Sequence, residues 1–175
     1  LVCQHGHLEA LKFLLTQGAK PETDDLAEAS AHSHLEIVDA LLTQDPELTS
    51  KCTSKRPGSF EGMTPLMFIF GTAKELSPNY KEVVKRLIKG GVDINAKTKD
   101  GTTALKLVCG RELLEALKFL LAQDANPEVE ELIAASMQGH LEIVDALLTH
   151  DPLLTLKTLK GSTALMAIFR FKANR

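Results

Sequence analysis

One ten-residue segment, HLEIVDALLT, occurs twice in this chain, at residues 34–43 and again 106 residues later at residues 140–149. On an α-helix, its apolar residues fall along one stripe and its acidic residues on the opposite side. This is the pattern of a helix with one buried face. An Asp-Pro pair follows each copy, and proline cannot continue a helix. The segment therefore predicts an amphipathic helix that stops at each Asp-Pro pair.

The duplication extends well beyond these ten residues. Residues 1–51 align without a gap to residues 107–157, and about two thirds of the aligned positions are identical. The chain also contains shorter internal repeats: five versions of one longer helix begin near residues 8, 35, 81, 114 and 141. Three glycine-led segments, GMTPLMFIF, GTTALKLVC and GSTALMAIF, each predict a shorter helix. Repetition on this length scale is typical of solenoid architectures.

The repeated unit resembles the ankyrin repeat. The resemblance is carried by GMTPL at residues 62–66, GVDINA at 91–96, GTTAL at 101–105 and GHLEIV at 139–144. It implies an all-α fold, an ankyrin-repeat solenoid of stacked helix-turn-helix units with β-turn fingers, some of which are missing. A solenoid is held together by the interfaces between neighbouring repeats.

The resemblance covers residues 1–175 as a single ankyrin-repeat array, which we expect to be a segment of a longer chain. Two insertions interrupt it, at residues 52–58 and 71–78, and they are read either as neutral loop drift or as a recognition feature. Units two and five lack the T-P-L start, so we expect no finger there, and Asp24 or Thr23 to cap the helix of unit two. The predicted units are approximately 1–22, 23–51, 59–97, 98–128, 129–157 and 158–175.

Composition favours an intracellular globular protein. Hydrophobic residues make up 44% of the chain, and no apolar run is long enough to span a bilayer. We therefore expect no membrane insertion and no leader segment. Cys3 and Cys109 occupy equivalent places in two apolar runs, which predicts small buried side chains rather than disulfides. The expected location is the cytoplasm, with the nucleus as an alternative.

Charge is distributed unevenly along the chain. The net charge is −7 over residues 1–50, +6 over residues 51–118 and −2 over residues 119–175. The basic middle favours a partner with an acidic segment. The alternative is that lysines such as Lys81, Lys85 and Lys89 only solvate an outer helix face.

The family resemblance implies a binding surface made of finger tips and the inner ends of the shorter helices. Phe60 is of most interest, either as an exposed aromatic anchor or folded back on its own loop. Ala31 and His32 are the corresponding inner positions of unit two. The residues carried over as partner contacts are Lys55, Arg56, Phe60, Glu61, Met63, Lys99, Asp100, Thr102, Arg111, Leu159 and Lys160.

No pattern in the sequence points to catalysis, a cofactor or a metal. Histidines two residues apart, such as His5 and His7, point away from each other on a helix, whereas zinc ligands must converge. His7, His34 and His140 instead stand where the family places a structural histidine, at the start of the longer helix. We expect no enzyme activity, no small-molecule substrate, no cofactor and no metal site.

The sequence therefore predicts a non-catalytic scaffold or adaptor that binds another protein or peptide through its concave face and fingers. One alternative is a regulatory or spacer array in a larger signalling protein, of the channel, kinase or death-domain type. A second is nucleic-acid binding, which the negative net charge and the single tyrosine disfavour. The segment is expected to be monomeric. Asn95 is a candidate for hydroxylation, although its ordinary role is to hold a turn.

Overall fold

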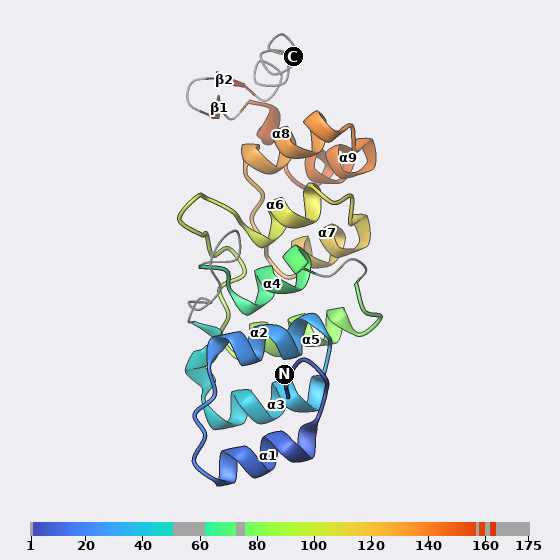
Figure 1. Cartoon of the computed structure of the whole chain (residues 1–175). Coiled ribbons are helices and arrows are strands. Elements are labelled where there is room, and N and C mark those ends of the chain that lie inside the picture. The colour runs from blue at the N-terminus through green and yellow to red at the C-terminus, as the bar shows by residue number, and fades with distance from the viewer. Residues whose placement is uncertain (1, 51–61, 73–75, 157, 160–161, 164–175) are drawn as a thin grey trace. The chain divides into compact units, whose positions relative to one another are not determined.

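A computed structural model of the chain describes residues 2–50, 62–72, 76–156, 158–159 and 162–163 (Figure 1). These residues form nine α-helices, two short 3-10 helices and one hairpin of two-residue strands. The chain divides into two compact parts, which we call the N-terminal module (Leu1–Thr102) and the C-terminal module (Thr103–Arg175). Each module is described by itself, and the single array over residues 1–175 stays a prediction.

The N-terminal module is built in two layers of helices. The inner helices α2 and α4 pack against each other, and the outer helix α3 contacts α1, α2 and α5. The 3-10 helix η1 follows α3, and the Thr49 hydroxyl donates a hydrogen bond to the Gly90 carbonyl at 2.8 Å, which ties η1 to the end of α5. The elements are α1 (Leu8–Thr16), α2 (Thr23–Ala31), α3 (Leu35–Gln44), η1 (Pro46–Thr49), α4 (Pro65–Thr72) and α5 (Tyr80–Lys89).

The C-terminal module repeats this plan with the inner helices α6 and α8 and the outer helices α7 and α9. Strand β1 pairs antiparallel with β2, with Thr158 opposite Thr163 and Leu159 opposite Ser162, and this hairpin is the finger predicted around GSTAL. The elements are α6 (Ala104–Cys109), α7 (Leu114–Leu121), α8 (Val129–Gln138), α9 (Leu141–His150), η2 (Pro152–Thr155), β1 (Thr158–Leu159) and β2 (Ser162–Thr163).

The helical repeat predicted from the sequence is confirmed, including its stop signals. Helices α3 and α9 end at Gln44 and His150, one residue before each Asp-Pro pair. The Asp45 carboxylate then accepts the Glu47 backbone N–H at 3.0 Å and caps η1, and Asp151 caps η2 in the same way. Between α1 and α2, and between α7 and α8, the described chain contains no strand.

One local prediction was wrong. Neither Asp24 nor Thr23 caps α2: the N-cap is Glu22, whose backbone N–H donates to the Asp25 carboxylate at 3.0 Å. A carboxylate three residues into the helix reaches back to the cap, so the Glu22–Asp25 spacing decides the boundary. Helix α4 continues to Thr72, whose hydroxyl donates to the Phe68 carbonyl at 2.8 Å, so the first two residues of the predicted insertion at 71–78 are helical.

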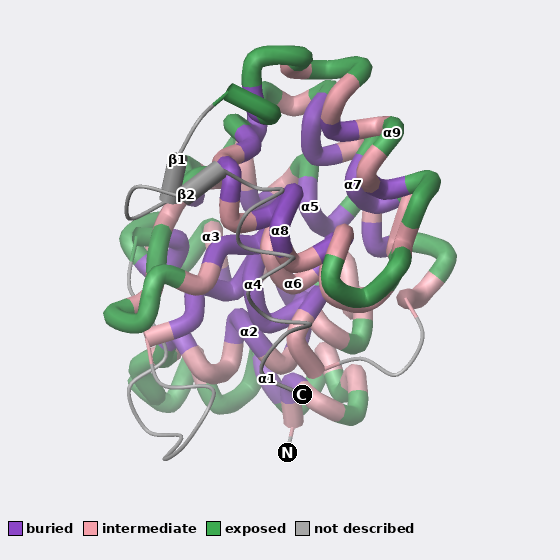
Figure 2. Tube along the Cα trace, turned by 90° about the horizontal axis from the view of Figure 1, so that it is seen from above, coloured by how far each residue is buried: buried purple, intermediate pink, exposed green. Residues whose placement is uncertain are grey.

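The core of each module is mainly aliphatic and lies along the inner helices, where Figure 2 shows the buried residues in purple. Every residue from Pro65 to Phe70 in α4 is buried, so this helix has no wet face over that length. Phe68 and Phe70 are the largest fully buried side chains described. In the part of the chain that the structure describes, no helix is both long enough and apolar enough to cross a bilayer.

The same eight residues, LEALKFLL, form α1 in one module and α7 in the other, in different surroundings. Leu14 in α1 is 43% exposed, whereas the equivalent Leu120 in α7 is fully buried at 0%. Ala10 is likewise exposed and its counterpart Ala116 is buried. Because the sequence is identical, the difference in burial comes from the neighbouring elements alone.

This pair offers a test of how far neighbours stabilise each helix. Leu120→Ala is expected to lower the free energy of unfolding by about 2–4 kcal/mol, because it opens a cavity in a packed core. Leu14→Ala, with the same change in helix propensity, is expected to cost less than about 1 kcal/mol because that side chain is half in water. Urea denaturation followed by circular dichroism measures both, and equal losses would contradict the assigned burial.

Candidate functional site

The structure describes some of the predicted contact residues and not others. Lys55, Arg56, Phe60, Glu61 and Lys160 lie outside the described residues. Leu159 lies in strand β1. Lys99, Asp100 and Thr102 belong to a finger of the N-terminal module, and Arg111 follows α6 in the C-terminal module.

The prediction that Met63 is a partner contact was wrong. Its side chain is only 5% exposed and belongs to the core of the N-terminal module. It follows Gly62, which has a φ of +80°, a left-handed conformation that glycine adopts without steric cost. The chain turns at Gly62, and the residue after the turn enters the core ahead of α4.

The finger of residues 98–102 is held by its own hydrogen bonds. The Thr98 N–H donates to the Thr102 carbonyl at 3.0 Å, and the Gly101 N–H donates to the Thr98 carbonyl at 3.0 Å. The Asp100 carboxylate accepts hydrogen bonds from the hydroxyls of Thr98 and Thr102. Asp100 therefore has a structural role in shaping this finger, whereas Lys99 is exposed at its tip.

Asn95 is exposed in the same loop, upstream of the finger. Its backbone N–H donates to the Asp93 carboxylate at 2.9 Å, so Asp93 supplies a side-chain acceptor that holds this turn. Hydroxylation of Asn95 stays a prediction.

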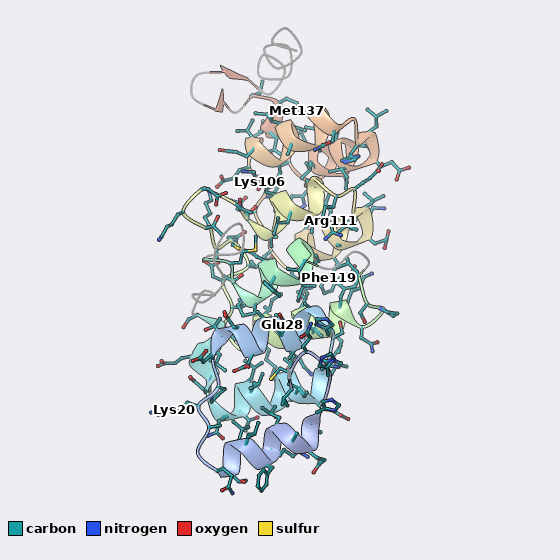
Figure 3. The ribbon with its side chains drawn as sticks, in the orientation of Figure 1. Lys20, Glu28, Lys106, Arg111, Phe119 and Met137 are labelled. Carbon is teal, nitrogen blue, oxygen red and sulfur yellow. The ribbon has the colours of Figure 1, made fainter. Side chains whose placement is uncertain are left out.

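Helix α6 brings two basic residues to the accessible surface of the C-terminal module. Lys106 lies in α6 and Arg111 lies just beyond its end, and both are partly exposed (Figure 3). Lys106 was missed from the sequence, although a signal was present: the equivalent positions in the other two glycine-led segments hold Met67 and Met166. Met67 is buried at 1% exposure, so a charged residue at this place marks a surface on α6 that α4 does not have.

A buried carboxylate positions α6. The Thr103 hydroxyl accepts the Lys106 backbone N–H at 3.0 Å and donates to Glu131 Oε1 at 2.7 Å. Glu131 is 2% exposed, and its Oε2 accepts the Glu128 backbone N–H at 2.9 Å. A buried charge must be satisfied by hydrogen bonds, so this bridge fixes the start of α6 against the start of α8.

The inner helix α2 of the N-terminal module carries acidic side chains, whereas α6 carries a basic one. Asp24, Asp25 and Glu28 are partly exposed along α2, and the Glu28 side chain is labelled in Figure 3. His32, at the end of α2, is exposed and lies 3.6 Å from the Glu28 carboxylate. Ala31, its predicted companion, is half-buried. An accessible acidic α2 and an accessible basic α6 therefore occur in separate modules.

Two cysteines are buried in the core, and three histidines stand at the starts of helices. Burial raises the pKa of the Cys109 thiol from 9.0 to about 12, with a smaller contribution from Glu131, and raises that of Cys3 to about 11, with a contribution from Asp25. His7, His34 and His140 are the N-cap residues of α1, α3 and α9, the positions predicted for them. Among the described residues, no group of three or more potential ligands could hold a metal ion.

The Thr103–Glu131 bridge leads to a stability prediction. Thr103→Val keeps the branched shape but removes the cap of α6 and the donor to a buried carboxylate, so it is expected to cost about 1–3 kcal/mol. The neighbouring Thr102→Val is the control, because its hydroxyl bonds only within an exposed finger, and about 0.5 kcal/mol or less is expected. Chemical denaturation of both variants compares the two losses, and a larger loss for Thr102→Val would refute this role of Thr103.

The raised thiol pKa values lead to a reactivity prediction. With iodoacetamide at pH 8, alkylation of Cys3 and Cys109 in the native protein is expected to be at least about 100-fold slower than in denaturant, because the thiolate is the reactive form. Since each folded-state pKa lies above 9.0, this contribution to stability is complete below pH 9 and is lost as the pH rises through about 11 to 12. Peptide mapping follows each cysteine, and rapid native labelling of Cys109 would disprove its burial.

Comparison with known proteins agrees with this architecture. A family model described as ankyrin repeats, in three copies, matches residues 26–131 and 69–158. The ankyrin repeat and KH domain-containing protein mask of Drosophila melanogaster is 31% identical over 157 residues, covering 82% of this chain and 4% of that protein. The related mask-1 of Caenorhabditis elegans is 28% identical over 153 residues, covering 79% of this chain and 5% of that protein.

A putative ankyrin repeat-containing protein of Treponema pallidum is 36% identical over 81 residues, covering 46% of this chain and 25% of that protein. The chain thus spans only a small part of the length of the relatives it matches. Ankyrin repeats are in general non-catalytic modules for protein–protein interaction. The family model, the stacked helical pairs and the fingers agree, and the chain belongs to the ankyrin repeat family.

Proposed function

We propose that this chain binds an acidic segment of a partner protein, and that the basic residues Lys106 and Arg111 of the C-terminal module make the main contacts. The observation that carries this proposal is the position of Lys106. It is a charged, partly exposed residue on an inner helix, at a place where the equivalent residue of α4 is a buried methionine. The charged end of Lys106 does not contribute to packing in the core.

The ammonium group of Lys106 has no oppositely charged partner among the described residues. Within the described part of the chain, the Lys106 ammonium forms no ion pair, whereas its backbone N–H donates to the Thr103 hydroxyl and its carbonyl accepts the Gly110 N–H. Lys118 on the outer helix α7, by contrast, lies 3.8 Å from Glu115. The ammonium group of Lys106 is therefore available to a carboxylate of a partner, and charge complementarity of this kind speeds association and selects the partner.

Finger residues of the N-terminal module are further proposed contacts, separate from those of α6. Lys99 is exposed on a finger whose backbone is fixed by internal hydrogen bonds, so little conformational entropy is lost when it binds. Lys55, Arg56, Phe60 and Lys160 remain proposed contacts from the sequence. The two buried free thiols support a reducing, intracellular setting for this interaction.

The proposal is tested by selecting peptides from a random display library on the immobilised chain. We expect peptides rich in Asp and Glu to be enriched, and binding of the best peptide to weaken about tenfold or more in Lys106→Glu/Arg111→Glu, because two attractions become repulsions. The matched control is Lys85→Glu/Lys89→Glu, which changes the net charge by the same amount on the exposed side of the outer helix α5. Enrichment of neutral or basic peptides, or equal weakening by both double variants, would refute the proposed site.

A further inference from the structure

The accessible side of the inner helices in the C-terminal module, which we call its inner surface, is apolar next to the basic residues. Met137, near the end of α8, is 38% exposed, and Figure 3 labels it together with Lys106 and Arg111. Apolar residues that stay accessible and are bordered by charge are typical of an interaction site. The apolar members of the inner surface, all partly or fully exposed, are Leu107 and Gly110 from α6 and its C-cap, and Ala134 and Met137 from α8.

Met137 and Gly110 hold equivalent places on neighbouring helices. The same backbone hydrogen bond closes both inner helices, from the Leu113 N–H to the Val108 carbonyl at 3.2 Å and from the His140 N–H to the Ala135 carbonyl at 3.0 Å. Met137 lies three residues before His140, and Gly110 lies three residues before Leu113. Helices α6 and α8 contact each other, and the buried bridge between their starts fixes their register. The methionine side chain therefore stands beside a position where α6 has none.

Gly110 leaves open space on the inner surface. Among the described residues, a Cβ placed on Gly110 would meet only the carbonyl oxygens of Lys106 and Leu107, at 3.4 and 4.0 Å, which are ordinary contacts within its own turn. Its φ of −71° is one that any residue adopts, so the backbone does not require a glycine here. The position therefore gives a partner's side chain room beside Met137, one turn from Lys106 and next to Arg111.

The equivalent positions of the N-terminal module have a different character. The offset of 106 residues relates Ala134 to Glu28 and Met137 to Ala31. The Glu28 carboxylate lies 3.6 Å from Nδ1 of His32, so α2 is acidic where α8 is apolar. About two thirds of the positions in the two copies are identical, yet both of these inner positions diverge, and both become more apolar in the C-terminal module.

We propose that the acidic segment bound by this chain carries a large aliphatic side chain, of the size of leucine, which packs against Met137 in the space beside Gly110. Carboxylates on either side of that residue pair with Lys106 and Arg111. The inference rests on the proposed function, because the two basic residues select an acidic segment and the apolar residues set its register. A flexible thioether adapts to apolar side chains of different shape, and their contact adds affinity that exposed ion pairs alone do not provide.

Two defined peptides test the proposal. The probes are the acetylated, amidated peptides GDEDELDEDEG and GDEDESDEDEG, titrated into the whole chain with carbon-13 at its methionine methyl groups, and Met137→Leu assigns the Met137 resonance. We expect the leucine peptide to shift that resonance and to bind about five- to tenfold more tightly than the serine peptide. In Met137→Ala, and in Gly110→Leu, which fills the open space, the two peptides are expected to bind within about twofold of each other.

The neighbouring Gln138→Ala is the matched control, because it shortens an exposed side chain on the same turn and leaves the apolar residues intact, so the preference for leucine is expected to remain. Circular dichroism checks that each variant keeps its helices. If the unchanged chain binds both peptides equally, or if Met137→Ala keeps the preference, the aliphatic contact is overturned while the acidic-segment function stands. Failure of both peptides to bind would overturn both proposals together.

Discussion

The structure depends on one constraint: a short amphipathic helix cannot bury its apolar stripe without a neighbour. Neighbouring units bury the apolar faces that a single unit would leave in water, so the interfaces between units stabilise the fold. The identical helices α1 and α7 show the effect directly, because Leu120 is buried and Leu14 is half in water although their local sequences are the same.

Local signals in the sequence were sufficient to predict the fold. The 3.6-residue periodicity and the Asp-Pro stops located the longer helices, and the glycine-led segments located α4 and α6. Predictions failed where a contact between residues distant from the pattern decides the outcome. Met63 flanks a turn that resembles an exposed finger, but its side chain enters the core. Glu131 looks like a helix-start acid, and only its partner Thr103, 28 residues away, explains its burial.

The duplication also shows that backbone conformation is retained when the side chain changes. Glu112, the counterpart of Gly6, keeps a positive φ of 57°, against 75° for the glycine. A Cβ at Gly6 would lie 2.7 Å from the His34 ring, whereas Glu112 is accommodated and its carboxylate lies 3.4 Å from Nδ1 of His140, the counterpart of His34. The histidine side chain therefore adapts to its neighbour while the turn keeps its shape. Such compensations are invisible in either copy alone.

The candidate sites were harder to predict than the fold because binding depends on what is left unpaired. The repeat pattern assigns Asp39 and Asp145 the same place, yet Asp39 pairs with Arg86 and Asp145 forms no ion pair with a residue that the structure describes. Similarly, Lys106 stands where Met67 is buried. Net charge over the whole chain is a poor guide to binding, since exposed charges more than about 8 Å apart are largely screened at physiological salt. Within the C-terminal module, the basic Lys106 lies on α6 and the acidic Glu142 and Asp145 lie on α9. The shared repeat pattern does not predict such differences in charge, which arise where the two copies diverge or where one copy lacks a neighbouring charge.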